Sequence, residues 1–214
     1  MVKKTLGIVG GLDSETATKF LLKINDLVKK KTNEQPHIIL DNIPIPKKDE
    51  ESIIKGNLNT NHKRLVQESL DRLVKAGANV IAIPCNTVHS FFDELKCNIP
   101  LLNIIDITLD STRGEKIGLL GTSTTINQNL FQNKTNKTII TLGKKDQHLL
   151  DKCIIQIINS KKPKGLEKIS AKLKKKGAES IILGCTTLHN TLTSAIHVDS
   201  LTQLAKKAIA VMEE

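Results

Sequence analysis

The sequence predicts an α/β protein made of two pseudo-symmetric halves, each with a mainly parallel sheet flanked by helices and with the active site in the cleft between them. The main observation is a stretch that occurs twice, at 77–89 and 177–189, with Gly, Ala, Cys, Thr and His matched at a spacing of 100 residues. Each copy is typical of a helix ending at a glycine, a buried strand, and a cysteine followed by small polar residues. Strand-like runs at 5–11 and 116–122, both ending in glycine, also resemble each other.

The chain length agrees with this division. The 214 residues are enough for two α/β units of about 100 residues each. We expect a first half at 1–114 that carries Cys85 and a second half at 115–214 that carries Cys185, with the C-terminal helix able to pack back on the first half. Each cysteine would lie at the carboxyl end of a parallel strand, where open α/β sheets bind ligands.

The elements of the first half follow from the apolar pattern and from glycine and proline punctuation. Asp13 or Ser14 is placed to cap the first helix. In order, we expect a strand at 5–11, a helix to about residue 31, a strand at 37–41, a loop made rigid by two prolines at 42–49, a helix at 61–76, the strand before Cys85, a short helix at 87–95, a strand at 101–105 and a helix from Asp106.

The second half repeats the opening of the first. Its first strand ends in Gly121, and the hydroxyls of Thr122–Thr125 can cap the next helix and reach a ligand. After the strand at 116–122 and this helix, we expect a strand at 138–142, helices at about 146–159 and 165–176, the strand before Cys185, and a final helix at about 199–213.

Composition limits the function classes. Only 2% of residues are aromatic, which argues against a base-stacking surface for single-stranded nucleic acid. The net charge of +10 comes almost entirely from lysines spread along the chain, and lysine runs at helix ends are usually solvated. We find no signal-peptide pattern and no apolar stretch of the ~18 residues that a membrane span needs. We therefore expect a cytoplasmic protein with reduced cysteines that binds neither nucleic acid nor membrane.

Two thiols in matched settings favour acid–base chemistry. Removing the proton next to a carboxylate leaves a carbanion, so the base must be close and well aimed. Returning a proton to the opposite face inverts the centre and needs a second group, which two pseudo-symmetric halves provide. The helix that starts after each cysteine is expected to lower the thiol pKa. The side chains expected to bind the substrate carboxylates are Asn86, Thr87, Thr186 and Thr187.

Two other roles for the cysteines stay open at this stage. Each repeat has a histidine four residues after its cysteine, His89 and His189, and two Cys with two His can bind Zn²⁺. Alternatively, the thiols are small buried apolar groups, which fits Cys97 and Cys153. The second alternative does not explain why small polar residues follow both repeated cysteines. Against the metal site, each cysteine lies at a strand end, before the helix is established, and no C-x₂-C pattern exists, so we expect no metal.

Two further segments could contact a substrate. Gly10 and Gly11 let the backbone approach a small anion at a helix N-terminus, or they form a tight turn only. In the proline-containing loop, Lys47 or Lys48 could meet a substrate carboxylate, or the loop is merely solvated.

Four motifs together resemble the aspartate/glutamate racemase superfamily, in its aspartate racemase branch. They are Gly10-Gly11-Leu12, Cys85-Asn86-Thr87-Val88-His89, Leu119-Leu120-Gly121-Thr122 and Gly184-Cys185-Thr186. The resemblance implies an enzyme without pyridoxal phosphate, other cofactor or metal, commonly a homodimer, in which Cys85 and Cys185 are opposed bases. The residues it implies around the substrate are Gly11, Leu12, Lys48, Asn86, Thr87, Thr122, Thr125, Thr186 and Thr187.

The sequence departs from the family pattern at two positions. Lys48 stands where the aspartate branch often has an arginine, and lysine does not form the bidentate fork with a carboxylate. Thr187 stands where the family usually has a glutamate. The expected function is aspartate racemisation by two thiols. The alternatives are a broad-specificity amino-acid racemase, a related carboxylate isomerase or decarboxylase, and a basic anion- or nucleic-acid-binding protein that retains only the fold.

Overall fold

A computed structural model of the chain describes residues 3–55 and 57–214. It contains two four-stranded sheets, ordered β2-β1-β3-β4 and β6-β5-β7-β8, in which every pair of neighbours is parallel. The predicted α/β class with two parallel sheets is confirmed. The strands are β1 (Leu6–Gly10), β2 (Ile38–Asn42), β3 (Val80–Ala82), β4 (Leu101–Leu102), β5 (Lys116–Leu120), β6 (Thr138–Ile140), β7 (Ser180–Leu183) and β8 (His197–Asp199).

Helices connect the strands of both sheets. Among the described residues, no helix has the length and apolar character needed to cross a membrane. The α-helices are α1 (Ser14–Thr32), α2 (Lys47–Ile54), α3 (Thr60–Lys75), α4 (Ile104–Asp110), α5 (Ser123–Asn127), α6 (Lys144–Ile158), α7 (Leu166–Lys175) and α8 (Ser200–Glu213), and the 3₁₀ helices are η1 (Thr87–Glu94), η2 (Gln132–Lys134) and η3 (Thr186–Leu188).

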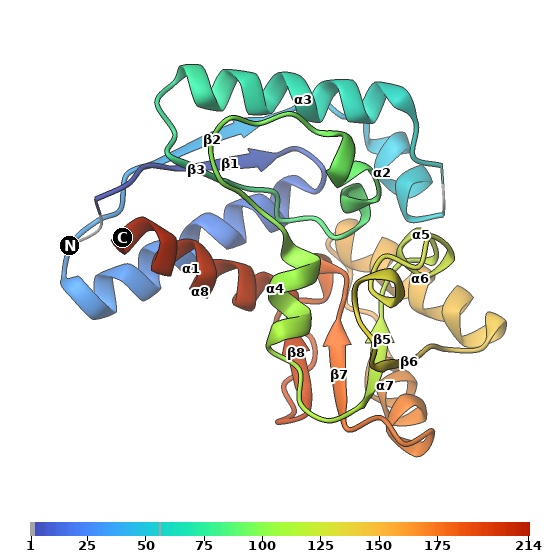
Figure 1. Cartoon of the computed structure of the whole chain (residues 1–214). Coiled ribbons are helices and arrows are strands. Elements are labelled where there is room, and N and C mark those ends of the chain that lie inside the picture. Colours follow the sequence, from blue (N-terminus) through green and yellow to red (C-terminus); the bar gives the residue numbers. More distant parts are fainter. Residues whose placement is uncertain (1–2, 56) are drawn as a thin grey trace.

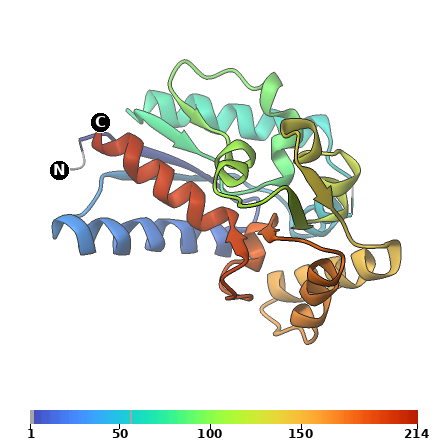
Figure 2. The same ribbon diagram turned by 60° about the horizontal axis from the view of Figure 1, so that its bottom comes forward.

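The first sheet is covered by helices on both faces. Figure 1 shows α3 over one face and α1 and α8 over the other, and the turned view in Figure 2 shows α1 and α8 side by side. Successive side chains of β1 point to opposite faces of the sheet, which explains why both faces are covered. Leu6 and Ile8 lie in a core cluster with Phe20 of α1 and Leu204 of α8, whereas Val9 lies in the cluster beneath α3.

One hydrophobic core joins the two sheets. Ile117 and Leu119 of β5 belong to the same buried cluster as Leu6 of β1 and Ala208 of α8. The next residue of β5, Leu120, faces the opposite side, in a cluster with residues of α6 and α7. The C-terminal helix therefore packs back onto α1 and β3, and backbone amides of the N-terminal segment bond to its last turn, Lys3 N to Met212 O at 3.0 Å. The division of the chain at residue 114 stays a prediction.

The repeat seen in the sequence is repeated in the packing. A Cβ placed on Gly7 of β1 would lie 3.1 Å from Ala78 Cβ, and a Cβ placed on Gly118 of β5 would lie 3.1 Å from Ala178 Cβ. Gly7 pairs with Ile81 of β3, just as Gly118 pairs with Ile181 of β7. A glycine favours this close approach, and the two halves set their first strand against the next strand and the helix before it in the same way.

Three predictions about elements were wrong. The expected loop at 42–49 is interrupted at Lys47 by α2, because Pro46 has the extended backbone of a cap and acidic residues follow in the first turns. The expected strand at 101–105 ends at Leu102, because Asn103 caps a helix that begins before Asp106. The strand β8 was missed, because three half-buried residues show no distinct pattern.

We predict that Gly11→Ala destabilises the protein much more than Gly77→Ala. Both glycines have positive φ, +86° and +92°, but a Cβ on Gly11 would lie 2.0 Å from Ile43 O, whereas a Cβ on Gly77 meets nothing within 4 Å. Gly77→Ala should cost about 1–2 kcal/mol of backbone strain, and Gly11→Ala several kcal/mol in total. Urea unfolding of both variants measures the difference. Equal losses would contradict the tight packing of the Gly11 turn on Ile43.

Candidate active site

The two repeated cysteines lie at corresponding strand ends. Cys85 follows β3 and Cys185 follows β7, each beside the start of a 3₁₀ helix. Cys185 is buried, with 8% of its surface exposed, and Cys85 is partly exposed. A charge on Cys85 raises the pKa of Cys185. The fold therefore brings the two thiols near enough to influence each other.

Burial dominates the ionisation of both thiols. Desolvation raises the pKa of Cys85 to about 11, although the backbone N–H groups of Val88 and Thr87 act to lower it. Desolvation likewise raises the pKa of Cys185 to about 12, against hydrogen bonds from Thr187. We predicted that the helix after each cysteine lowers the thiol pKa. This prediction was wrong, because the pKa of each thiol is raised overall. The N–H groups act in the expected direction, but loss of water around the thiolate outweighs them.

Three predicted threonines form a buried hydroxyl cluster that joins the two halves. Thr87 Oγ1 lies 3.2 Å from Thr122 Oγ1 and 3.5 Å from Thr125 Oγ1. Thr122 also caps α5, since its hydroxyl oxygen accepts a bond from Thr125 N at 3.1 Å, as the sequence predicted. The structure thus brings together side chains from η1 and from the start of α5.

Asn86 and Thr186 also reach across to the other half. Thr186 Oγ1 donates to Pro84 O at 3.0 Å, and Asn86 Nδ2 donates to Ser200 Oγ at 3.0 Å. Ser200 in turn donates to Leu183 O at 2.8 Å, which fixes the direction of the amide. The other amide atom, Asn86 Oδ1, is buried and has no hydrogen-bond partner among the described residues. It is an unused acceptor on the residue that follows Cys85.

Asp13 was predicted as a helix cap and missed as a site residue. It does cap α1, and its carboxylate also accepts a hydrogen bond from Thr187 Oγ1 at 3.0 Å. Its charge raises the pKa of Cys85 and of Cys185. The capping pattern was the only signal in the sequence, because the contact with Thr187 joins residues far apart in the chain.

The remaining predicted residues differ in their surroundings. Gly11 packs against the backbone of Ile43, which favours the tight-turn interpretation, and the Leu12 side chain lies in the core cluster beneath α3. Lys48 is in the first turn of α2, and its side chain, like that of Lys47, lies outside the described residues. The structure therefore adds nothing about the predicted contact between Lys48 and a carboxylate.

His89 has a structural role. Its Nδ1 donates to Cys85 O at 2.8 Å, and its Nε2 accepts from Ile104 N at 3.3 Å. Burial lowers its pKa to about 4, so the ring is neutral near pH 7. With both ring nitrogens bonded to backbone, His89 has none left for a metal. It instead fixes the backbone at Cys85 against the start of α4.

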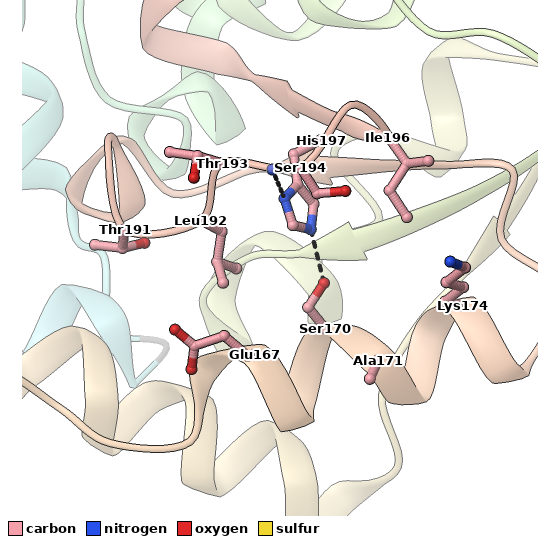
Figure 3. A pocket seen from close by; sticks show the side chains of 10 residues that line it. All are labelled: Glu167, Ser170, Ala171, Lys174, Thr191, Leu192, Thr193, Ser194, Ile196 and His197. Atoms are coloured by element: carbon pink, nitrogen blue, oxygen red, sulfur yellow. Dashed lines mark hydrogen bonds between the residues drawn. The ribbon is translucent and has the colours of Figure 1, made fainter.

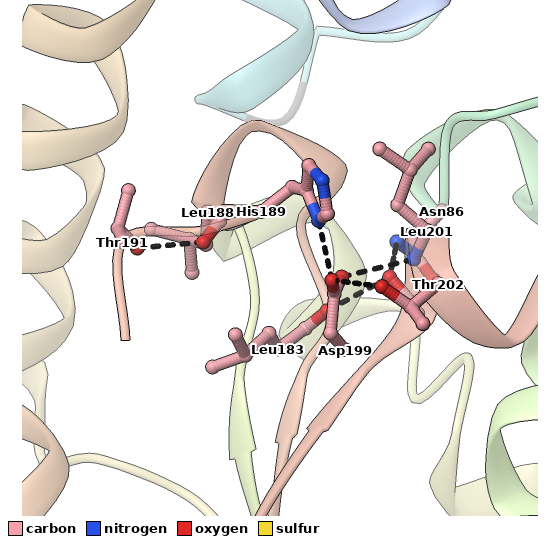
Figure 4. A network of polar contacts seen from close by, with 9 residues as sticks. Asn86, Leu183, Leu188, His189, Thr191, Asp199, Leu201 and Thr202 are labelled. Carbon is pink, nitrogen blue, oxygen red and sulfur yellow. Dashed lines mark hydrogen bonds and ion pairs between the residues drawn. The ribbon is translucent and has the colours of Figure 1, made fainter. Parts of the chain in front are cut away.

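His189 is held by a carboxylate at the end of β8. Its Nδ1 bonds to Asp199 Oδ2, which also accepts from Thr202 Oγ1 at 2.6 Å, as Figure 4 shows. Burial acts to raise the pKa of Asp199, but the bonds from His189 and Thr202 outweigh it and the pKa is lowered. Asn86 lies beside this network. Through its bond to His189, the ionised Asp199 orders the segment after Cys185.

A Ser–His pair lines a cavity that neither Cys85 nor Cys185 lines. The cavity, of about 360 Å³, is lined by α7 and by residues 191–197 (Figure 3). His197 Nδ1 accepts from Ser194 N at 3.1 Å, and its Nε2 lies 2.7 Å from Ser170 Oγ. Because Nδ1 accepts, the ring proton is on Nε2 and points to Ser170. His197 therefore cannot take a proton from this serine in the structure, and the pair joins α7 to β8.

The chain is similar in sequence to known proteins. The family model described as "Asp/Glu/Hydantoin racemase" matches residues 9–208. The chain is 26% identical over 136 residues to the broad specificity amino-acid racemase RacX of Bacillus subtilis (strain 168). That match covers 59% of this chain and 58% of the relative, so the chain aligns with less than two thirds of the relative's length.

Solved structures show the same fold. Picrophilus torridus aspartate racemase is 21% identical, with a TM-score of 0.77, over 98% of this chain and 94% of that chain. An aspartate racemase homologue from Pyrococcus horikoshii is 24% identical, with a TM-score of 0.77, over 100% of both chains. At these identities the likeness establishes the fold.

We predict that burial of neutral His89 makes the protein sensitive to acid. The unfolded chain binds this proton near pH 6.5 and the folded chain near pH 4, so stability is full above pH 6.5 and falls as the pH drops toward 4. The loss should reach about 3 kcal/mol. The free energy of unfolding, measured with urea between pH 7 and pH 4, should fall less steeply with decreasing pH in His89→Gln than in the unmodified protein. The exposed residue His148 provides a control, since His148→Gln should leave this pH dependence unchanged. If the unfolding free energy of His89→Gln depended on pH as steeply as that of the unmodified protein, the assignment of His89 as a buried neutral ring would be contradicted.

Proposed function

Because this chain belongs to the Asp/Glu/hydantoin racemase family, we propose that it is a cofactor-independent amino-acid racemase that works by two-base proton transfer between Cys85 and Cys185, with aspartate as the first candidate substrate. One observation carries the proposal. The two repeated cysteines follow corresponding strands of the two sheets, Cys85 after β3 and Cys185 after β7, and a charge on Cys85 raises the pKa of Cys185, as expected for two thiols that serve one site.

In the proposed reaction one thiolate and one thiol act together. The Cys85 thiolate takes the α-proton from one face of the substrate, and the carbanion is left with the electron pair of the broken C–H bond. The Cys185 S–H then gives its proton to the opposite face, and the new C–H bond has inverted stereochemistry. After the step Cys85 is the thiol and Cys185 the thiolate, so the roles exchange for the reverse reaction.

The ionisation of the thiols supports this division of roles. A negative charge on Cys85 raises the pKa of Cys185. This charge therefore opposes ionisation of Cys185, which favours one thiolate and one thiol over two thiolates. A substrate ammonium group near the thiols would further stabilise the single thiolate. The unpartnered Asn86 Oδ1 is an acceptor suited to an ammonium group.

A broad-specificity racemase is the second candidate. Asp13 places a negative charge at the site, which opposes binding of a second substrate carboxylate unless a cation offsets it. The relative from Bacillus subtilis is itself named a broad specificity amino-acid racemase. A neutral or basic amino acid would avoid this repulsion.

We predict that Cys85→Ser and Cys185→Ser each lower the rate of racemisation by about 10²–10⁴-fold, since one proton-transfer group is lost. Each variant should still exchange the α-proton of one enantiomer with solvent, because the other thiol survives. The two variants should therefore differ in which enantiomer they label in D₂O. Cys97→Ser, which changes a partly exposed thiol outside the site, serves as the control and should keep full activity. Full activity in both site variants would contradict the proposed mechanism.

The substrate class is tested by incubating the enzyme in D₂O with L-aspartate, L-glutamate, L-alanine and L-lysine. We expect α-deuterium and the opposite enantiomer from aspartate. Label in alanine and lysine at comparable rates would instead establish the broad-specificity alternative. Label confined to a dicarboxylic acid without an amino group would contradict racemisation of amino acids and favour a carboxylate isomerase.

A further inference from the structure

We propose that Asp13 is a positioning residue for the two thiols, directing the Cys185 proton through the hydroxyl of Thr187 and supplying a fixed negative charge that both thiols share. This inference rests on the proposed two-thiol reaction, but it concerns properties of the thiols that are measured without a substrate.

The carboxylate of Asp13 is held in place from two sides. Its Oδ1 accepts from Thr16 N at 3.3 Å and its Oδ2 accepts from Thr16 Oγ1 at 2.5 Å, both from the first turn of α1. From the other half of the chain, Thr187 Oγ1 lies 3.0 Å from Oδ2. The N-terminus of α1 also favours a negative charge at this position. The Asp13 side chain is therefore held in one orientation at the junction of the two halves.

The hydroxyl of Thr187 has only one proton to give. A carboxylate accepts and does not donate, so in the bond to Asp13 the hydroxyl is the donor. Thr187 also acts to lower the pKa of Cys185, as a hydroxyl that can donate to the thiolate does. While its proton is directed to Asp13, its oxygen can only accept from the Cys185 S–H. When Cys185 is a thiolate, the same hydroxyl must turn to donate to sulfur. Asp13 thus favours the protonated, oriented form of Cys185.

The corresponding thiol of the first half lacks this link. Thr87 occupies the same place after Cys85, but its hydroxyl meets Thr122 and Thr125, which are neutral. The pseudo-symmetric site is therefore electrically asymmetric. Cys185 is connected to a carboxylate through one hydroxyl, whereas Cys85 adjoins a cluster of hydroxyls. This difference favours Cys185 as the proton donor and Cys85 as the base in the resting protein.

The other charged groups nearby have partners of their own. Glu15, in the same turn as Asp13, is exposed and pairs with Lys19 at 2.8 Å. His189, which follows Thr187, is bonded to Asp199. Among the described residues, Asp13 is the ionised group that raises the pKa of both thiols, and Cys85 acts in addition on Cys185.

The test is the pH dependence of thiol alkylation by iodoacetamide, with Cys85 and Cys185 followed separately by mass spectrometry. Asp13→Asn removes the charge and keeps a good N-cap for α1. We expect the alkylation midpoints of both thiols to move to lower pH, by on the order of one unit. Asp26→Asn removes the same charge from an exposed position of the same helix, paired with Lys30, and should leave both midpoints unchanged.

A second pair of variants tests the hydroxyl link. Thr187→Val removes the donor available to the Cys185 thiolate and should move its midpoint to higher pH, with little change at Cys85. Thr187→Ser keeps the hydroxyl and should restore the behaviour of the unmodified protein. A residue that only caps the helix or fills space would alter melting temperature without this selective pattern, so thermal unfolding of each variant is recorded alongside.

Two outcomes overturn the proposal. One is a folded Asp13→Asn protein whose thiols keep their original midpoints. The other is a Thr187→Ser protein that behaves like Thr187→Val. Because alkylation requires no amino-acid substrate, these results are independent of turnover. If the alkylation pattern is as expected but Cys85→Ser and Cys185→Ser keep full activity, the proposed function fails and the role of Asp13 in thiol ionisation stands.

Discussion

The position of the two cysteines depends on the close packing of one strand against the segment that leads into the neighbouring strand, in each half. Gly7 lies on Ala78, and Gly118 lies on Ala178, with the same separation. Ala78 and Ala178 each stand two residues before the neighbouring strand, β3 or β7, and the cysteine follows the end of that strand. The buried cluster that contains both Leu6 and Leu119 then holds the two sheets together. A proton-transfer site made from two halves needs such rigidity, because its two groups come from different sheets.

Burial affects both the ionisation of the thiols and the strength of the polar interactions around them. It raises the pKa of both thiols, so the site favours thiols over thiolates near neutral pH. It also strengthens every hydrogen bond and charge interaction inside the site. The site is therefore poised to respond to a bound cation, and the unpartnered Asn86 Oδ1 and the Asp13 carboxylate are the groups that could receive one.

Much of the fold was predictable because its signals are local. The helices α1, α3, α6 and α7 follow from apolar spacing and caps, and the repeat at Cys85 and Cys185 identified both strand ends. What the sequence did not reveal depends on long-range contacts. The bond between Asp13 and Thr187 joins residues 174 positions apart, and the link from Asn86 to Ser200 joins residues 114 positions apart. The net pKa of each thiol depends on how much water the folded site excludes, which no local pattern records.

The most direct test of two-base transfer is the isotope content of substrate and product early in the reaction in D₂O, starting from one enantiomer of the amino acid turned over. A thiol pair predicts that the product carries solvent deuterium while the remaining substrate keeps its original proton, because the two faces are served by different groups. Product that retains the substrate's own proton would contradict the account. So would product and remaining substrate that gain deuterium at the same rate, since both results indicate a single base.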